Sequence, residues 1–98
     1  MFDPATNARI LAGSTHTDVL TFDDYKSARD YLSGRYVKYS KKVGGAVDVW
    51  LGSEYMDSGH KLCVFADLPA RAPSPSGDDC SVRVRFSYRL AGNAWCGE

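Results

Sequence analysis

The stretch CSVRVRFSYRL, residues 80–90, alternates apolar and polar side chains with a strict period of two. Successive side chains of a β-strand point to opposite faces, so this pattern predicts a strand with one buried side and one water-facing side. The water-facing side carries three arginines, Arg83, Arg85 and Arg89. Such a row is either ordinary solvated surface or part of a binding site, and the surrounding sequence is needed to distinguish the two.

The composition is that of one folded domain. The chain has 98 residues, of which 44% are hydrophobic and 24% charged, and these values argue against global disorder. Twelve basic and twelve acidic side chains give a formal net charge of zero. A general nucleic-acid binder would show an excess of Lys and Arg, so that class is disfavoured.

The sequence predicts a cytoplasmic protein without a bound cofactor. The N-terminus lacks the charged and apolar regions of a signal peptide, and no apolar run is long enough to span a bilayer. The three cysteines, Cys63, Cys80 and Cys96, are an odd number without the spacing of a disulfide framework. Reduced thiols in a cytoplasm are therefore the simplest expectation.

Two helices are expected before residue 35. Asp3 followed by Pro4 is typical of a helix start, which predicts a short N-terminal helix over 4–12. The main helix is expected over 22–33, with Thr21 and Asp24 forming a capping box and Gly34 ending it. Its buried stripe would be Tyr25, Ala28 and Leu32, which follow helical spacing.

The rest of the chain predicts an antiparallel sheet over 35–90. Four strands alternate within RYVKYS (35–40), AVDVWL (46–51), KLCVFADLP (61–69) and residues 80–90, and TDVLTF (17–22) offers a fifth. Residues 41–45 (KKVGG) supply a turn, residues 70–79 a mobile loop and residues 91–98 a tail. The expected fold is a two-layer α+β domain with the strands in meander order and the main helix packed on one face.

Matching the apolar faces of the last two strands sets a register for their hairpin. Leu68 would pair with Cys80, Ala66 with Val82, Val64 with Val84 and Leu62 with Phe86. Val37, Val49, Val64 and Val84 would then line the core beneath the main helix. The opposite face would combine aromatic and basic side chains, and it is the predicted partner-binding surface: Tyr36, Lys38, Trp50, Phe65, Arg83, Arg85 and Arg89.

Three interpretations of that face stay open. It is a plain solvated face, or it is covered by the N-terminal helix or a second subunit, or it binds a partner. Large aromatics on a water-facing side favour binding, because Trp, Tyr and Arg are enriched in interface hot spots. Stacking of arginines on neighbouring aromatic rings is expected in each case.

Metal binding and catalysis have weaker support. The spacing of His60, Cys63, Cys80 and Cys96 matches no standard zinc module, so no metal is predicted. The run Asp57-Ser58-Gly59-His60 is better explained as a polar turn than as a catalytic triad. A small ribonuclease using Arg83, Arg85, His60 and Glu54 is the enzyme alternative.

The sequence thus favours a non-enzymatic protein that binds a protein partner. A small, motif-free chain of this kind is similar in size and type to the inhibitors that phages and mobile elements carry against host defence proteins, anti-CRISPR proteins included. A single-stranded nucleic-acid-binding module using the same face is the alternative. A homodimer through the sheet face or edge is the remaining option.

Overall fold

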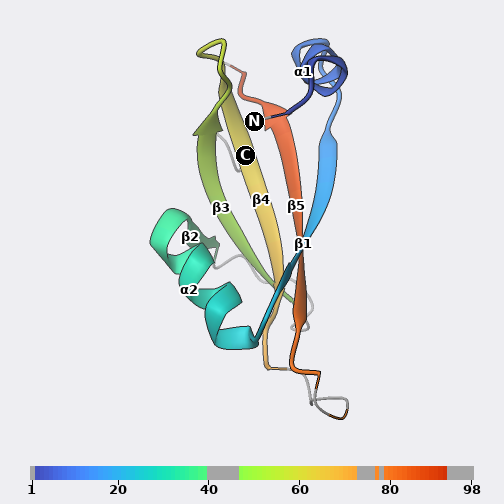
Figure 1. Ribbon diagram of the computed structural model, residues 1–98. Coiled ribbons are helices and arrows are strands. Elements are labelled where there is room, and N and C mark those ends of the chain that lie inside the picture. Colours follow the sequence, from blue (N-terminus) through green and yellow to red (C-terminus); the bar gives the residue numbers. More distant parts are fainter. Residues whose placement is uncertain (1, 40–46, 73–76, 78, 93–98) are drawn as a thin grey trace.

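The alternating stretch forms strand β5 (Val82–Leu90), which lies between two other strands of a five-stranded antiparallel sheet. The computed structural model describes residues 2–39, 47–72, 77 and 79–92. The other strands are β1 (His16–Phe22), β2 (Val37–Tyr39), β3 (Val47–Tyr55) and β4 (Lys61–Pro69), and the sheet order is β1-β5-β4-β3-β2 (Figure 1). The predicted α+β class is confirmed.

The meander order is correct for β2 to β5 but not for the whole sheet. The offered fifth strand is present as β1, and it pairs with β5 rather than with β2, its neighbour among the strands along the chain. Helix α2 (Tyr25–Arg35) connects the two edges of the sheet, because β1 precedes it and β2 follows it (Figure 1). The two edge strands are therefore separated by the full width of the sheet.

Both helices begin at an aspartate. The Asp3 carboxylate accepts a hydrogen bond from the Thr6 N–H (3.0 Å) and starts α1 (Pro4–Leu11), close to the expected 4–12. In α2 the cap is Asp24, which accepts from the Ser27 N–H (2.7 Å). The predicted capping box at Thr21 is wrong because β1 continues through Thr21 to Phe22.

Helix α2 also continues beyond its predicted end. Gly34 lies inside the helix, and the N–H of Tyr36 closes the last turn on the Leu32 carbonyl (2.7 Å). The predicted buried stripe is confirmed for Ala28 and Leu32, which are fully buried. Tyr25 is half-buried, and its hydroxyl donates to the Pro69 carbonyl (2.7 Å), which fixes the helix against the end of β4.

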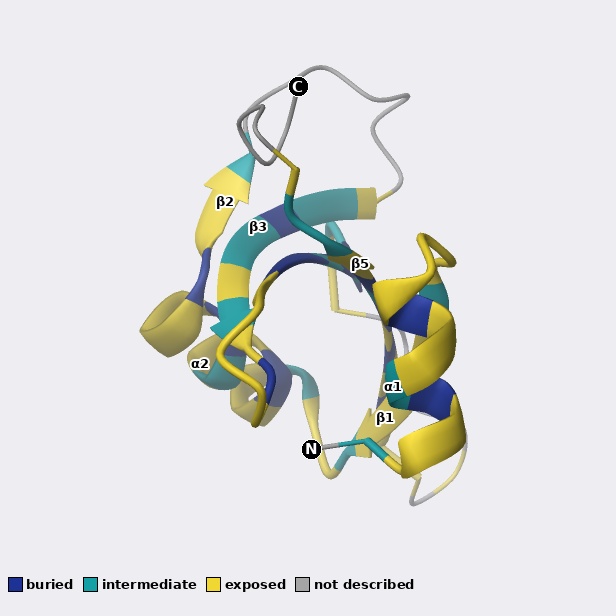
Figure 2. Ribbon diagram, turned by 90° about the horizontal axis from the view of Figure 1, so that it is seen from above, coloured by how far each residue is buried: buried dark blue, intermediate teal, exposed yellow. Residues whose placement is uncertain are grey.

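The core lies between α2 and one face of the sheet, called here the inner face. Seen from above, the sheet curves around the side that holds α2 (Figure 2). Val64 and Val84 are fully buried there, as predicted, together with Phe86. Helix α1 lies beyond the end of the sheet where β1 begins, and its Ile10 joins the same core cluster (Figure 1). Neither helix lies over the other face of the sheet, called here the outer face.

The predicted β4–β5 register is wrong by four residues. Leu62 lies opposite Leu90 rather than Phe86, and Ala66 lies opposite Phe86 rather than Val82. A shift by an even number keeps every side chain on its face, so Leu62, Val64 and Ala66 are still buried. Cys80 falls before β5 and is exposed, not inward-facing.

Several predicted segments lie outside the described residues. These are the turn at 41–45, the loop residues 73–76 and 78, and the tail residues 93–98. In the described part of the chain, no helix is long and apolar enough to cross a membrane.

Candidate functional site: the outer sheet face

The outer face is defined by strand register, because residues directly opposite each other in a sheet point the same way. Arg85 of β5 lies opposite Val19 of β1 on one side and Asp67 of β4 on the other. Phe65 lies opposite Ser87 of β5 and Leu51 of β3. The outer face therefore contains Phe65 and all three arginines of β5, four of the seven predicted site residues.

Two of the arginines make side-chain contacts on this face. The Arg85 guanidinium lies 3.0 Å from the Asp67 carboxylate, and both side chains are substantially exposed. The guanidinium carbon of Arg89 lies 5.3 Å from the ring centre of Phe65. The expected stacking of an arginine on a neighbouring aromatic ring is thus present, between diagonal neighbours on β4 and β5. Arg83 makes no ion pair or hydrogen bond with a described residue.

Trp50 and Tyr36 were predicted on the outer face, and both predictions are wrong. Trp50 lies opposite Ala66 on the inner face and is 6% exposed. Tyr36 caps α2 and is also 6% exposed. The alternation of β3 favours burial of its valine side, because Trp50 is the one large apolar residue on the other side of the strand. Burying the indole removes more apolar surface from water than burying a valine, and the small Ala66 leaves room for it.

Lys38 likewise belongs to the inner side. It lies opposite Trp50, and its amino group is 3.2 Å from the Asp48 carboxylate. The buried and exposed faces of β3 are the reverse of those predicted. Lys38 follows them, because β2 takes its facing from the strand with which it pairs. Val37 consequently points outward and is 73% exposed, and Val49 also lies on the outer face, whereas both were expected in the core.

Strand pairing places on the outer face several residues that sequence reasoning missed. Val19, Val37, Val47 and Tyr55 are all exposed there, and Tyr55 is 64% exposed. The signal was present in β3, where Trp50 stands between Val49 and Leu51 and competes with them for the core. Exposed apolar side chains beside cations are typical of binding surfaces rather than of plain solvated faces.

Charge is divided unequally between the two faces. Among the described strand residues, the outer face carries four cations, Lys61, Arg83, Arg85 and Arg89, and one carboxylate, Asp67. The inner face carries three carboxylates, Asp18, Asp48 and Glu54, and one lysine, Lys38. The formal net charge of zero therefore conceals a basic outer face.

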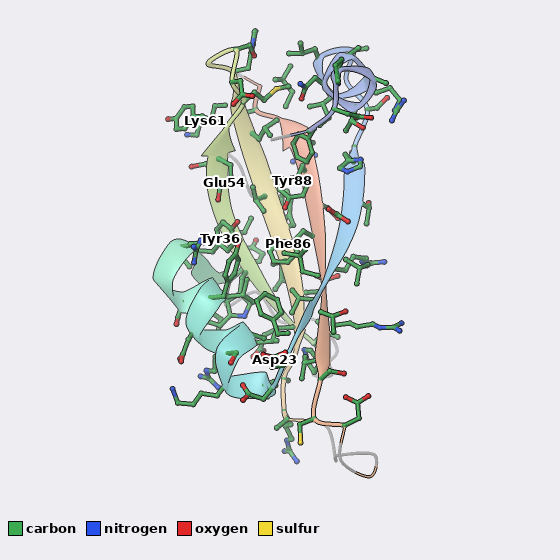
Figure 3. The ribbon with its side chains drawn as sticks, viewed as in Figure 1. Asp23, Tyr36, Glu54, Lys61, Phe86 and Tyr88 are labelled. Carbon is green, nitrogen blue, oxygen red and sulfur yellow. The ribbon has the colours of Figure 1, made fainter. Side chains whose placement is uncertain are left out.

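The inner face holds a tyrosine cluster that is part of the core. The Tyr36 hydroxyl donates to the Glu54 carboxylate (3.0 Å), and Tyr36, Phe86 and Tyr88 lie on the same side of the sheet as α2 (Figure 3). Burial raises the pKa of the Tyr36 hydroxyl well above its ordinary value, and Glu54 raises it further. Burial raises the pKa of Tyr88 to about 12. Both hydroxyls are therefore neutral near pH 7.

The Asp57–His60 segment forms the turn between β3 and β4. Gly59 has a positive φ of 91°, and the Met56 N–H donates to the His60 carbonyl (2.8 Å). Ser58 Oγ lies 2.8 Å from His60 Nδ1, and both residues are exposed. The contact is a local one between residues two apart in a hairpin turn. Within the described ranges, no three His, Cys, Asp or Glu side chains are grouped as a metal site would require.

The cysteines differ from the expectation of three reduced thiols. Cys63 is disulfide-bonded and 2% exposed, although its position in β4 lies on the outer face. Cys80 is a free, exposed thiol.

Comparison with known proteins leaves the outer face as the main guide to function. No family model, curated protein or solved structure matches this chain.

Proposed function

We propose that this chain is a non-enzymatic binding protein that holds an acidic protein partner against its outer sheet face. The observation that carries the proposal is the combination of a basic row, Arg83, Arg85 and Arg89, with exposed apolar side chains on a face that neither helix covers. Apolar contacts supply most of the affinity in such interfaces, and complementary charge supplies specificity and a fast on-rate.

The charge of the outer face also favours one kind of partner. Its excess of cations fits an acidic surface and disfavours a second copy of this chain, because two such faces would repel each other. The structure favours a nucleic-acid partner less than the sequence alone did. Trp50 and Tyr36, two of the three aromatic side chains predicted on this face, are in the core, and Asp67 lies among the arginines.

The proposal extends to an inhibitor of the kind that phages and mobile elements carry. A chain of this size can act without chemistry by covering a surface that a host defence complex needs. Expressing the chain in a bacterial strain with active CRISPR immunity would test this role. Restored plaque formation by the targeted phage supports it, and unchanged immunity across the defence systems tried overturns it without affecting partner binding itself.

Partner binding is tested by affinity capture from nuclease-treated bacterial lysate. The wild-type chain is compared with an Arg83→Gln/Arg89→Gln variant and with a matched control, Lys26→Gln/Arg29→Gln, whose two residues are exposed on α2. A protein captured by the wild type and the control but not by the outer-face variant supports the proposal. Equal capture by all three chains overturns the proposal. A parallel capture from untreated lysate that yields nucleic acid, with no protein captured after nuclease treatment, overturns it as well.

A further inference from the structure

A hollow lies at one end of the outer face and spans four strands. Its volume is about 360 Å³, and it is lined by Val19, Val47, Asp67, Pro69, Arg83 and Arg85. Strand pairing sets the arrangement of these side chains, because Arg85 lies between Val19 and Asp67, and Pro69 lies opposite Val47. Charged groups from the two central strands therefore lie between apolar side chains from β1 and β3.

The charges of the hollow leave one cation uncompensated. Arg85 is paired with Asp67 at 3.0 Å. Arg83 has no ion pair with any described residue. The pKa of the exposed Asp79 is lowered mainly by its hydrogen bonds with Ser81, and Arg83 adds a smaller lowering. A guanidinium beside apolar walls gains most from a carboxylate, which it can hold through two parallel hydrogen bonds.

We propose that this hollow receives an acidic side chain of the partner, flanked by aliphatic residues, with its carboxylate on Arg83. This inference rests on the proposed function and specifies which part of the outer face recognises the partner. The flanking aliphatic side chains would contact Val19 and Val47. Asp67 holds Arg85 in place and restricts the hollow to a single negative charge, since a phosphate dianion would be repelled by the carboxylate.

The hollow can be tested without knowing the partner. The probe is a valine-aspartate-valine tripeptide, acetylated and amidated at its ends, added at millimolar concentration to the full ¹⁵N-labelled chain. The matched probe replaces aspartate by asparagine, and inorganic phosphate is the third ligand. The readout is the movement of the Val19 and Val47 amide signals. Arg83→Gln removes the proposed contact, and Arg29→Gln is the control, because Arg29 is exposed on α2 and does not line the hollow.

We expect saturable shifts at Val19 and Val47 with the aspartate peptide, and at least tenfold weaker binding of the asparagine peptide. Arg83→Gln should abolish the difference between the two peptides, and Arg29→Gln should preserve it. Equal binding of the two peptides, tighter binding of phosphate, or no saturable shift overturns the inference. If lysate capture still depends on the outer-face arginines in that case, the proposed function stands and only the role of the hollow is wrong.

Discussion

The ring of Tyr36 lies over Gly52, in the space that a Cβ at residue 52 would occupy. Gly52 is on the inner face of β3, opposite Val64, and the missing side chain lets the tyrosine pack directly against the strand. The Tyr36 hydroxyl then reaches Glu54, two residues further along the same strand. This contact joins the end of α2 to the sheet and holds Tyr36 away from the outer face.

Gly52→Ala should therefore destabilise the fold. The added methyl overlaps the Tyr36 ring, and overpacking of this kind typically costs about 1–3 kcal/mol. Gly34→Ala is the matched control, because a Cβ there meets nothing within 4 Å and the residue is inside α2. That change should stabilise the protein by about 0.5–1 kcal/mol. Chemical denaturation measures both, and equal effects would contradict the packing described.

A pair of valines tests which residues form the core. Val84 is fully buried, so Val84→Ala should lower the free energy of unfolding by about 1–3 kcal/mol through lost burial and a residual cavity. Val37 is 73% exposed, and Val37→Ala should change the free energy of unfolding by less than about 0.5 kcal/mol. A large loss at Val37 in urea titrations would show that β2 and β3 face the other way.

These valines also show when the sequence alone predicts which side of a strand is buried. The alternation of β5 identified its buried side correctly, because its other side is consistently polar and only one facing is compatible with a core. In β3 the alternation favours burial of Val47, Val49 and Leu51, but the large side chain of Trp50 on the other side takes the place in the core. Lys38 was misplaced because β2 takes its facing from β3. Tyr36 was misplaced because its contact with Gly52 joins distant parts of the chain, which a local pattern does not show.

Long-range pairing was the other limit. The register of β4 against β5 was wrong by four residues because an even shift leaves every apolar side chain on its face. The place of β1 beside β5 depends on a connection through α2 across the sheet, which no local signal specifies. Of the binding surface, the arginines and Phe65 were predictable, whereas Val19, Val47 and the hollow between them depend on the pairing of four strands.

The buried tyrosines predict a loss of stability at alkaline pH. Burial raises the pKa of Tyr88 from 10.0 to about 12, and the pKa of Tyr36 is raised as well. A group whose pKa is raised in the folded state contributes full stability below its unfolded pKa and loses it as the pH rises toward the folded value. The free energy of unfolding should therefore fall between about pH 10 and 12.

Tyr88→Phe should flatten that decline, because the variant has no hydroxyl to ionise at this position. Urea denaturation at a series of pH values, followed by circular dichroism, measures the slope for the wild type and the variant. An identical alkaline slope in the two proteins would show that Tyr88 ionises as readily in the folded state as in the unfolded one.

The redox states of two cysteines are directly measurable. Alkylation of the denatured chain without reductant should modify Cys80 and leave Cys63 unmodified, because Cys63 is disulfide-bonded. Addition of reductant before alkylation should then modify Cys63 as well. Peptide mass analysis distinguishes the two residues. Modification of Cys63 without reductant would restore the expectation of reduced thiols.

The most direct test of the account is the affinity of the captured partner for two variants, measured by calorimetry beside their melting temperatures. Replacing Arg83 and Arg89 by glutamine should weaken binding about 30-fold or more, since central anchors contribute about 2 kcal/mol or more. The melting temperature should stay close to that of the Lys26→Gln/Arg29→Gln control, because both arginines are exposed. Wild-type affinity in the outer-face variant, with the fold intact, would contradict the claim that this face holds the partner.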